Sequence, residues 1–400
     1  MKSIYGFIVW FIATLFVVYS FCLNTAAAVF SDAIKTSLHA TSVGASLASS
    51  AFILGFALMQ IPAGYLLDKL NARYVVSAGI LVLAVGNVIT SYAGNLVIFS
   101  ISNFIQGVGA SFSFVAAAVL ISQWFSPKSF PVLFGLTQAL SCILAGIIHY
   151  YFTLALSTVT WNVIYHQLSL MGFGLLVLSI LLVKSPADLK RGAGVSLFKS
   201  LSVVCGSAQI WLCAFAAALS FGVLLSYASF WYFPVQLFYS VTHIQSVITS
   251  AMIFVGIGIG TPILGWYSNI LKSRMMVIHV TLVVGVIALM LGIYLPHYNF
   301  NTLVISKVIS FCIGFFLSGS MLFYTIASEI SSNATRGVAI SVVNTTVFLF
   351  NTLMLFVPYL FITQDSKQFF TYLWMLPVFV MISILLIYFI KDSYTQSQVN

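Results

Sequence analysis

Residues 64–73 read Gly-Tyr-Leu-Leu-Asp-Lys-Leu-Asn-Ala-Arg, and residues 265–274 read Gly-Trp-Tyr-Ser-Asn-Ile-Leu-Lys-Ser-Arg. A glycine, a polar acceptor and an arginine recur at the same spacing, 201 residues apart, which is about half of the 400-residue chain. A proline closely precedes each glycine, at Pro62 and Pro262, and each stretch follows an apolar segment. The match indicates that the chain consists of two repeated halves.

The composition places most of the chain inside a lipid bilayer. Of the 400 residues, 61% are hydrophobic and only 5% are charged, whereas a soluble globular protein carries about 25% charged residues. Such a chain cannot cover a water-exposed surface, which excludes a soluble enzyme, a secreted domain and a disordered tail. Since a membrane-spanning helix needs about 20 apolar residues, a chain of this length holds roughly a dozen of them.

Twelve apolar segments have the length of a membrane-spanning helix. They cover residues 4–30, 43–67, 73–93, 96–122, 130–154, 162–183, 207–233, 245–268, 275–296, 301–328, 337–362 and 369–390. Each is apolar over about 20 residues or more, whereas the strands of a membrane β-barrel alternate in polarity over about ten residues. We therefore expect an all-α membrane protein with twelve transmembrane helices.

A polar stretch between the sixth and seventh apolar segments divides the chain. The expected organisation is an N-terminal six-helix half over residues 1–183, a cytoplasmic linker over 184–206, a C-terminal six-helix half over 207–391 and a short polar tail over 392–400. Together with the repeated motif, this organisation predicts two pseudo-symmetric halves.

The lysines and arginines predict the orientation of the chain in the membrane. With the N-terminus inside, the inside loops carry 12 of the 15 basic residues and the outside loops carry two, Lys35 and Lys367. Because basic residues concentrate in the cytoplasmic loops of membrane proteins, both termini are expected in the cytoplasm. The remaining base, Lys307, falls inside an apolar segment.

The repeated motif has a physical interpretation as the end of a helix. Gly64 lets neighbouring helices approach closely, and the Asp68 carboxylate can cap the positive N-terminus of a helix in the other half. Arg73 keeps the loop on the cytoplasmic side. We expect these residues to form a conformational switch, and the alternative is a charged turn that serves only as an anchor. The second copy consists of Gly265, Asn269 and Arg274.

Three further stretches, taken with the repeated motif, resemble the major facilitator superfamily. They are Asn103-Phe-Ile-Gln106-Gly107-Val-Gly109-Ala110, Trp124-Phe-Ser-Pro-Lys128 and Gly337-Val-Ala-Ile-Ser-Val-Val-Asn344. The resemblance covers nearly the whole chain. It implies a twelve-helix transporter that works by alternating access, with a substrate site between the halves near the bilayer midplane.

Two departures from the family pattern bear on the function. Asn103 stands where the family has an arginine, which weakens the case for proton handling at that position. Residues 135–151 lack the Gly-Pro-x-x-Gly-Gly run of proton-coupled drug exporters, which favours uptake over efflux. Shorter stretches resemble the phagosomal nutrient and amino-acid transporters of intracellular gammaproteobacteria. These stretches are Tyr19–Leu23, Met59–Gly64 and Trp231–Pro234.

Few ionisable residues fall within the apolar segments, where each is a functional candidate because its burial is costly. No carboxylate falls at mid-membrane depth in the sequence. Lys307 either presents a cation to an anionic substrate group or extends its side chain to the outer surface. An unperturbed histidine titrates near neutral pH, so His149 is a candidate for proton handling, and the alternative is a structural histidine.

Uncharged polar and aromatic side chains concentrate in the segments that the family resemblance places around the cavity. Each of them has an alternative role, because polar side chains in membranes also form interhelical hydrogen bonds unrelated to transport. The candidate substrate-cavity residues are Asn24, Asn103, Gln106, Gln138, Tyr227, Trp231, Lys307, Tyr324 and Asn344.

The sequence thus predicts a transporter in the inner (cytoplasmic) membrane of a bacterium that takes up a small polar nutrient, such as an amino acid or organic acid. The alternatives are an exporter of an apolar compound, metal chelate or drug, and a non-transporting receptor or lipid scramblase. No nucleophile–base constellation or metal-ligand cluster is visible, so no enzyme, cofactor or metal is expected. The expected partners are a small-molecule substrate and the lipid bilayer, without nucleic acid, and the chain is expected to be a monomer.

Overall fold

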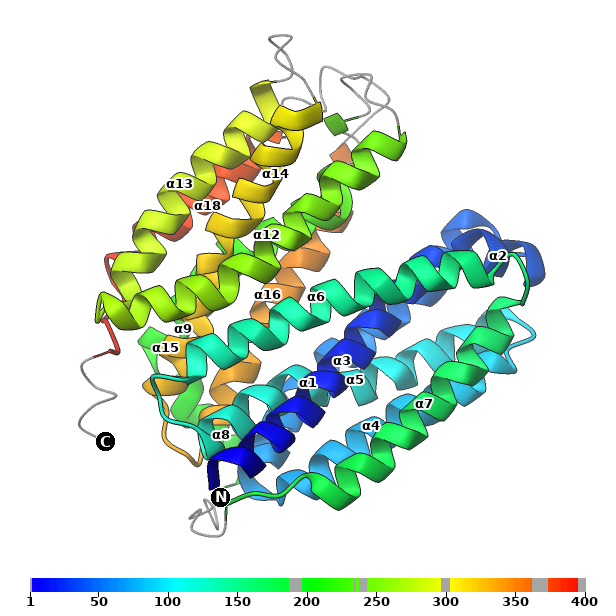
Figure 1. Ribbon diagram of the computed structural model, residues 1–400, viewed down its shortest axis with the longest axis horizontal. Helices are drawn as coiled ribbons and strands as arrows, with labels where there is room; N and C mark the ends of the chain where they lie inside the picture. The colour runs from blue at the N-terminus through cyan, green and yellow to red at the C-terminus, as the bar shows by residue number, and fades with distance from the viewer. Residues whose placement is uncertain are drawn as a thin grey trace. The chain divides into compact units, whose positions relative to one another are not determined.

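The computed structural model of the protein consists of helices and the turns that join them throughout the residues it describes (Figure 1). The described residues are 2–186, 196–232, 235–236, 243–295, 303–361 and 373–394. The all-helical prediction is therefore confirmed over this part of the chain. Residues 187–195 of the expected linker and 395–400 of the expected tail lie outside the described residues.

The helices of the first part of the chain follow the expected apolar segments closely. They are α1 (Lys2–Val29), α2 (Ser31–Ser37), α3 (Ser42–Lys69), α4 (Ala72–Ser91), α5 (Leu96–Trp124), α6 (Phe130–Ala155), α7 (Trp161–Leu182) and α8 (Leu197–Cys205). Asn71 and Asn95 cap α4 and α5 by accepting hydrogen bonds from backbone N–H groups of the first turns, at 3.2 and 2.9 Å. The short helices α2 and α8 were expected to be loop and linker.

Two of the expected helices in the second part are interrupted. The segments are α9 (Ala208–Ala217), η1 (Ala218–Gly222), α10 (Val223–Ser226), η2 (Tyr227–Trp231), α12 (His243–Ile270), α13 (Arg274–Tyr294), α14 (Leu303–Leu317), η4 (Ser318–Met321), α15 (Leu322–Glu329), α16 (Arg336–Phe361) and α18 (Met375–Ile387). The segments η1 and η2 are π-helical and η4 is 3₁₀-helical. Such turns interrupt α-helices at functional positions in many proteins.

Eleven stretches of the described residues are long and apolar enough to cross a membrane. The twelfth expected segment, 369–390, contains the shorter apolar helix α18, and residues 369–372 lie outside the described part. Helices suit this setting because a bilayer offers no water to the backbone, whose polar groups must be bonded within each segment.

The chain folds into two compact units, and each exchanges a short segment with the other half of the sequence. Unit 1 contains residues 1–126, 140–201 and 333–341, and unit 2 contains 127–139, 202–332 and 342–400. The first turns of α16 therefore belong with the N-terminal helices, and the first turns of α6 belong with the C-terminal helices. The expected halves 1–183 and 207–391 contain no such exchange.

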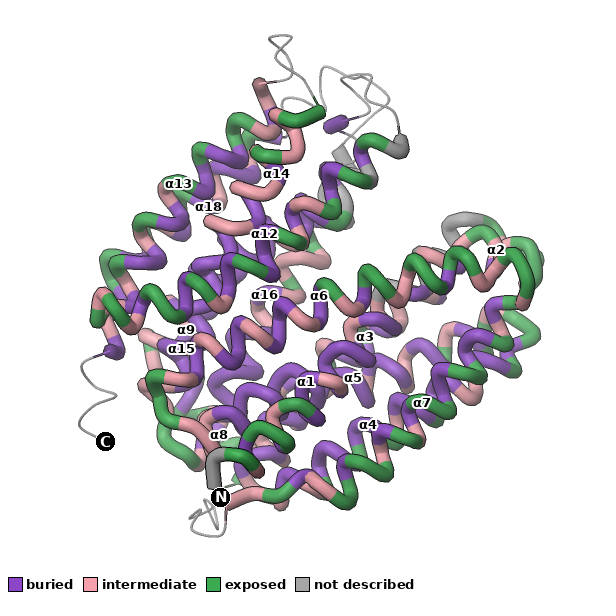
Figure 2. The backbone as a smooth tube through the Cα atoms, in the orientation of Figure 1, coloured by how far each residue is buried: buried purple, intermediate pink, exposed green. Residues whose placement is uncertain are grey.

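Within each unit, glycines allow the helices to pack at close range. A Cβ atom on Gly107 of α5 would overlap the backbone of Phe52 in α3, and one on Gly314 of α14 would overlap the backbone of Ile253 in α12. In Figure 2, buried positions recur along the faces that helices such as α4 turn to their neighbours, while exposed positions follow the opposite faces. In a membrane this packing supplies much of the association between helices, because lipid and side chains are equally apolar.

Replacing Gly107 by alanine should destabilise unit 1, because the added methyl group meets the α3 backbone and overpacking costs about 1–3 kcal/mol. Thermal unfolding of the purified protein in detergent, followed by tryptophan fluorescence, measures the effect. Gly174→Ala is the matched control, since a Cβ there meets no atom within 4 Å and alanine favours a helix by about 1 kcal/mol. Equal melting temperatures for the two variants would contradict this description of the packing.

Candidate functional site

Asp68 lies in the last turn of α3 and binds the N-terminus of α16. Its Oδ1 atom accepts a hydrogen bond from the backbone N–H of Gly337 at 2.7 Å, and its Oδ2 atom accepts one from Val338 at 3.1 Å. The side chain is almost fully buried. The first N–H groups of a helix lack partners within the helix and carry its positive dipole end, so they bind a carboxylate well.

Gly64 lies one turn before Asp68 and brings α3 against the same part of α16. A Cβ atom at this position would overlap the Gly337 carbonyl group and the Ser341 hydroxyl group. The glycine and the aspartate thus make two parts of one contact within unit 1. As predicted, the motif begins at the end of a helix; α3 runs two residues beyond the expected segment 43–67, to Lys69, so that only 70–71 form the turn.

Arg73, the third residue of the motif, contacts a different helix. Its Nε atom donates a hydrogen bond to the carbonyl oxygen of Val183, the C-terminal cap of α7, at 3.0 Å. Cations are favourable at this end of a helix because the last carbonyl groups carry its negative dipole end. Arg73 therefore ties the beginning of α4 to the end of α7.

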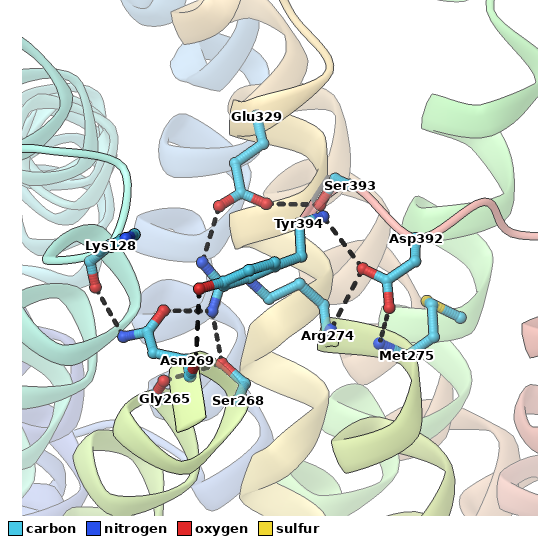
Figure 3. Close-up of polar contacts among 10 residues, drawn as sticks. All are labelled: Lys128, Gly265, Ser268, Asn269, Arg274, Met275, Glu329, Asp392, Ser393 and Tyr394. Carbon is cyan, nitrogen blue, oxygen red and sulfur yellow. Dashed lines mark hydrogen bonds and ion pairs between the residues drawn. The ribbon is translucent and has the colours of Figure 1, made fainter. Parts of the chain in front are cut away.

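The second copy of the motif makes a contact of the opposite polarity in unit 2 (Figure 3). Asn269 donates from its Nδ2 atom to the carbonyl oxygen of Lys128, just before α6, at 2.7 Å. Gly265 lies close to the beginning of α6, where a Cβ would overlap the backbone of Pro131. The side chain at the motif's acceptor position is therefore a donor here, whereas Asp68 is an acceptor.

Arg274 is completely buried and holds three side chains together. Its Nη1 atom donates to Ser268 Oγ at 2.6 Å and to Asn269 Oδ1 at 2.7 Å. Its Nη2 atom forms an ion pair with Glu329 Oε1 at 2.9 Å. Removing one member of a buried ion pair is strongly destabilising because it leaves the other charge without compensation. The equivalent arginine of the first copy, Arg73, is only half-buried.

Of the predicted cavity residues in unit 1, Gln106 joins two helices, whereas Asn103 bonds within its own helix. Gln106 donates to Thr90 Oγ1 at 2.5 Å, and its own Oε1 atom is buried without a hydrogen-bond partner. Asn103 donates to the Phe99 carbonyl of its own helix at 2.7 Å. Asn24 is half-buried on α1. Asn87, which no sequence motif marked, donates to the Tyr19 hydroxyl at 2.6 Å.

The predicted cavity residues of unit 2 lie on several helices and are mostly buried. Tyr324 donates to Asn344 Oδ1 at 2.9 Å, and Trp231 donates to the carbonyl oxygen of Met354 at 3.1 Å. Tyr227 is buried with its ring centroid 5.6 Å from that of Tyr232. Gln138 is also buried, in the part of α6 that belongs to unit 2.

Lys307 and His149 occupy different environments. Lys307 is half-buried near the beginning of α14, one turn before Ser310, whose hydroxyl bonds that of Tyr232 at 2.9 Å. A ring nitrogen of His149 lies 3.1 Å from the carbonyl oxygen of Cys22, which can only accept, so this nitrogen carries a proton. Among the described residues, no group of three or more His, Cys, Asp or Glu side chains is suited to a metal ion.

The repeated helical fold and the buried helix-end contacts define a multi-pass membrane protein of the transporter class. The family model of the Major Facilitator Superfamily matches residues 11–354. The chain therefore belongs to this superfamily of transporters, as the sequence motifs predicted.

Solved structures of two sugar transporters share the fold. The chain superimposes on the proton:xylose symporter XylE with a TM-score of 0.77 and 13% identity, over 98% of this chain and 97% of that one. It superimposes on FucP in the outward conformation with a TM-score of 0.71 and 17% identity, over 95% and 99% of the two chains. Identity this low establishes the fold alone.

A weaker sequence similarity relates the chain to multidrug resistance proteins. The multidrug resistance protein MdtL of Citrobacter koseri is 22% identical over 151 residues, and MdtL of Escherichia coli matches equally. The alignment covers 38% of this chain and 39% of the length of those proteins.

Asp68→Asn should release the first turn of α16, because the asparagine amide keeps only one acceptor oxygen. Its NH₂ group would face one of the two backbone N–H groups that the carboxylate binds. Hydrogen bonds to a charged group contribute about 1.5–3 kcal/mol, so exchange of the Gly337 and Val338 amide protons should rise about tenfold or more. Hydrogen–deuterium exchange with mass spectrometry measures this rise in peptides covering 333–341. Asp32→Asn, in the exposed ion pair with Lys35, is the control and should leave these peptides unchanged; unchanged exchange in Asp68→Asn would contradict the assignment.

Proposed function

We propose that the protein transports a small polar solute across the inner membrane of a bacterium by alternating access. The observation that carries the proposal is the buried contact of Asp68 with the first N–H groups of α16, residues that are 269 positions apart in the chain. A carboxylate bound to a helix N-terminus is stabilised while the contact is buried, and water hydrates the carboxylate when the two helices separate. The contact can therefore form and break during a transport cycle. Gly64 and Arg73, with Gly265, Asn269 and Arg274, belong to the same proposed switch.

The proposed substrate class is a small polar nutrient that bears a carboxylate, such as an amino acid or organic acid. Lys307 supports this choice. Each of the four described carboxylates is engaged elsewhere: Asp32 by Lys35, Asp68 by α16, Glu329 by Arg274, and Asp392 by the beginning of α13. The half-buried ammonium group of Lys307 in its membrane helix can therefore bind an anionic group of a substrate.

The surroundings of Lys307 include two hydroxyl groups that are bonded to each other. Ser310 lies at i+3 on α14 and thus on the same side of the helix. Its hydroxyl and that of Tyr232 are within hydrogen-bond distance, at 2.9 Å. A carboxylate accepts from an ammonium group and from hydroxyl groups. The competing role for Lys307 is extension of its side chain to the membrane surface.

The direction of transport that we propose is uptake, since residues 135–151 lack the run typical of proton-coupled exporters. The two structural neighbours described above are symporters of the sugars xylose and fucose, which are small polar solutes.

A second candidate function, export of an apolar compound, metal chelate or drug, is favoured by the partial similarity to MdtL. A deletion strain with unchanged drug resistance and unchanged secretion would count against export. The resemblance to phagosomal nutrient transporters and the monomeric state also remain predictions.

Uptake of radiolabelled amino acids and organic acids into proteoliposomes tests the proposed substrate class. We expect the wild-type protein to accumulate or exchange at least one of them, and Lys307→Ala to raise its KM at least tenfold while Lys307→Arg retains uptake. Lys199→Ala, at an exposed position on α8, is the charge-matched control. Neither accumulation nor exchange of any tested acid would refute this substrate class, and equal KM values for wild type and Lys307→Ala would remove Lys307 from the site.

Transport should not require a proton gradient, because the described carboxylates lie at helix ends and His149 is already bonded to the Cys22 carbonyl. A protonophore should therefore leave uptake or exchange in cells unchanged. Uptake that the protonophore abolishes, and that an acid-outside gradient drives in vesicles, would contradict this expectation. Loss of that drive in His149→Gln, which keeps a donor for the carbonyl, would then assign the coupling to His149.

A further inference from the structure

The first residues of the expected polar tail are packed against the second copy of the motif. Asp392, Ser393 and Tyr394 follow α18 and lie over Arg274 and Glu329 (Figure 3). Asp392 is half-buried, and the other two are almost fully buried. We call these three residues, which begin the expected short polar tail 392–400, the C-terminal clasp.

Asp392 caps the N-terminus of α13. Its Oδ1 and Oδ2 atoms accept hydrogen bonds from the backbone N–H groups of Arg274 and Met275, each at 3.2 Å. The Ser273 hydroxyl donates to Oδ2 at 2.5 Å, and the backbone N–H of Tyr394 donates to Oδ1 at 3.0 Å. A carboxylate at this position complements the dipole of the helix that begins with Arg274.

Ser393 and Tyr394 contact both members of the buried ion pair. The Ser393 hydroxyl donates to Glu329 Oε2, while Glu329 Oε1 is paired with Arg274. The Tyr394 ring lies over the guanidinium group, with Cζ of Arg274 5.0 Å from the ring centroid. Such a cation–π contact contributes about 0.5–2 kcal/mol, toward the upper end when it is buried.

Arg274 in turn determines which way the Asn269 amide points. Its Nη1 atom donates to Oδ1 of Asn269, which leaves Nδ2 to donate to the Lys128 carbonyl oxygen. An aspartate at 269 would place a second acceptor against that carbonyl, because an ionised carboxylate donates no hydrogen bond. The contact with the beginning of α6 therefore requires an amide, whereas the contact of Asp68 with N–H groups requires an acceptor.

We propose that the C-terminal clasp is a positioning element of the transport cycle: it holds Arg274, and through Arg274 it holds Asn269 on the backbone that precedes α6. The proposal rests on the proposed function in its last step alone, which is that this contact forms and breaks during transport. Its structural steps lie within unit 2, and each is a hydrogen bond, an ion pair or a ring contact between described residues.

Hydrogen–deuterium exchange tests the structural steps without any substrate. In Tyr394→Ala, exchange should rise about twofold to thirtyfold, the range set by the cation–π contact, in peptides covering 265–274 and 127–133. Tyr394→Phe keeps the ring and loses only the long hydrogen bond of the hydroxyl to the Asn269 carbonyl oxygen, at 3.4 Å, so its exchange should stay within about twofold of the wild type. Asn269→Asp should raise exchange in 127–133 while leaving the clasp protected, and it serves as the second variant should Tyr394→Ala fail to fold. A rise confined to 391–394 in Tyr394→Ala, or wild-type exchange at 127–133 in Asn269→Asp, would overturn the proposal.

Transport kinetics test the last step with whichever solute the protein moves. Tyr394→Ala should change Vmax at least threefold with an unchanged KM, because the clasp touches the moving contact and not the solute, and Tyr394→Phe should restore the wild-type Vmax. An equal loss in both variants, or a change in KM alone, would overturn the positioning role. Absence of transport by the wild-type protein would refute the proposed function. The hydrogen–deuterium exchange experiment would then decide whether the clasp positions Arg274 and Asn269.

Discussion

The hydrocarbon core of a bilayer offers no hydrogen-bond partners, and the architecture of this protein depends on that constraint. Backbone N–H and C=O groups must be paired within each spanning segment, so the described chain is helical. Charges are confined to 5% of the residues, and helices associate through close packing, as at Gly107 and Gly314. Strong polar interactions are left to the helix ends, where the first N–H groups and last carbonyl groups need partners. Asp68, Arg73 and Asp392 all bind such groups.

The two copies of the motif pack helices in the same way but form different hydrogen bonds. In both, a glycine brings the end of one helix against the beginning of another, α3 on α16 and α12 on α6. The adjoining side chain then bonds whichever backbone group it faces, N–H for Asp68 and C=O for Asn269. The Asp68 contact involves a charged side chain and the Asn269 contact a neutral one. When a contact breaks, hydration stabilises the freed carboxylate more than the freed amide. The two copies of the repeat thus share a mode of helix packing, while their hydrogen bonds differ.

Spacing in the sequence predicted more of this site than side-chain identity did. The interval of 201 residues located both helix ends, and long apolar runs located the spanning helices. The interruptions at η1, η2 and η4 could not be predicted, because none of these segments contains a proline and π and 3₁₀ turns arise from packing. The partners Val183, Lys128 and Met354 act through their carbonyl oxygens, which every residue possesses, so their side chains carried no signal.

The sequence by itself determined the class of protein, the helical architecture, the repeat and the residues at the two helix ends, because hydrophobic run length and motif spacing are local properties. The tertiary structure alone decided three things. It grouped the beginning of α16 with unit 1 and that of α6 with unit 2, reversed the polarity of the second contact, and placed the C-terminal clasp on Arg274. Each depends on which backbone groups a side chain meets across more than a hundred residues of sequence, and only packed helices bring those groups together.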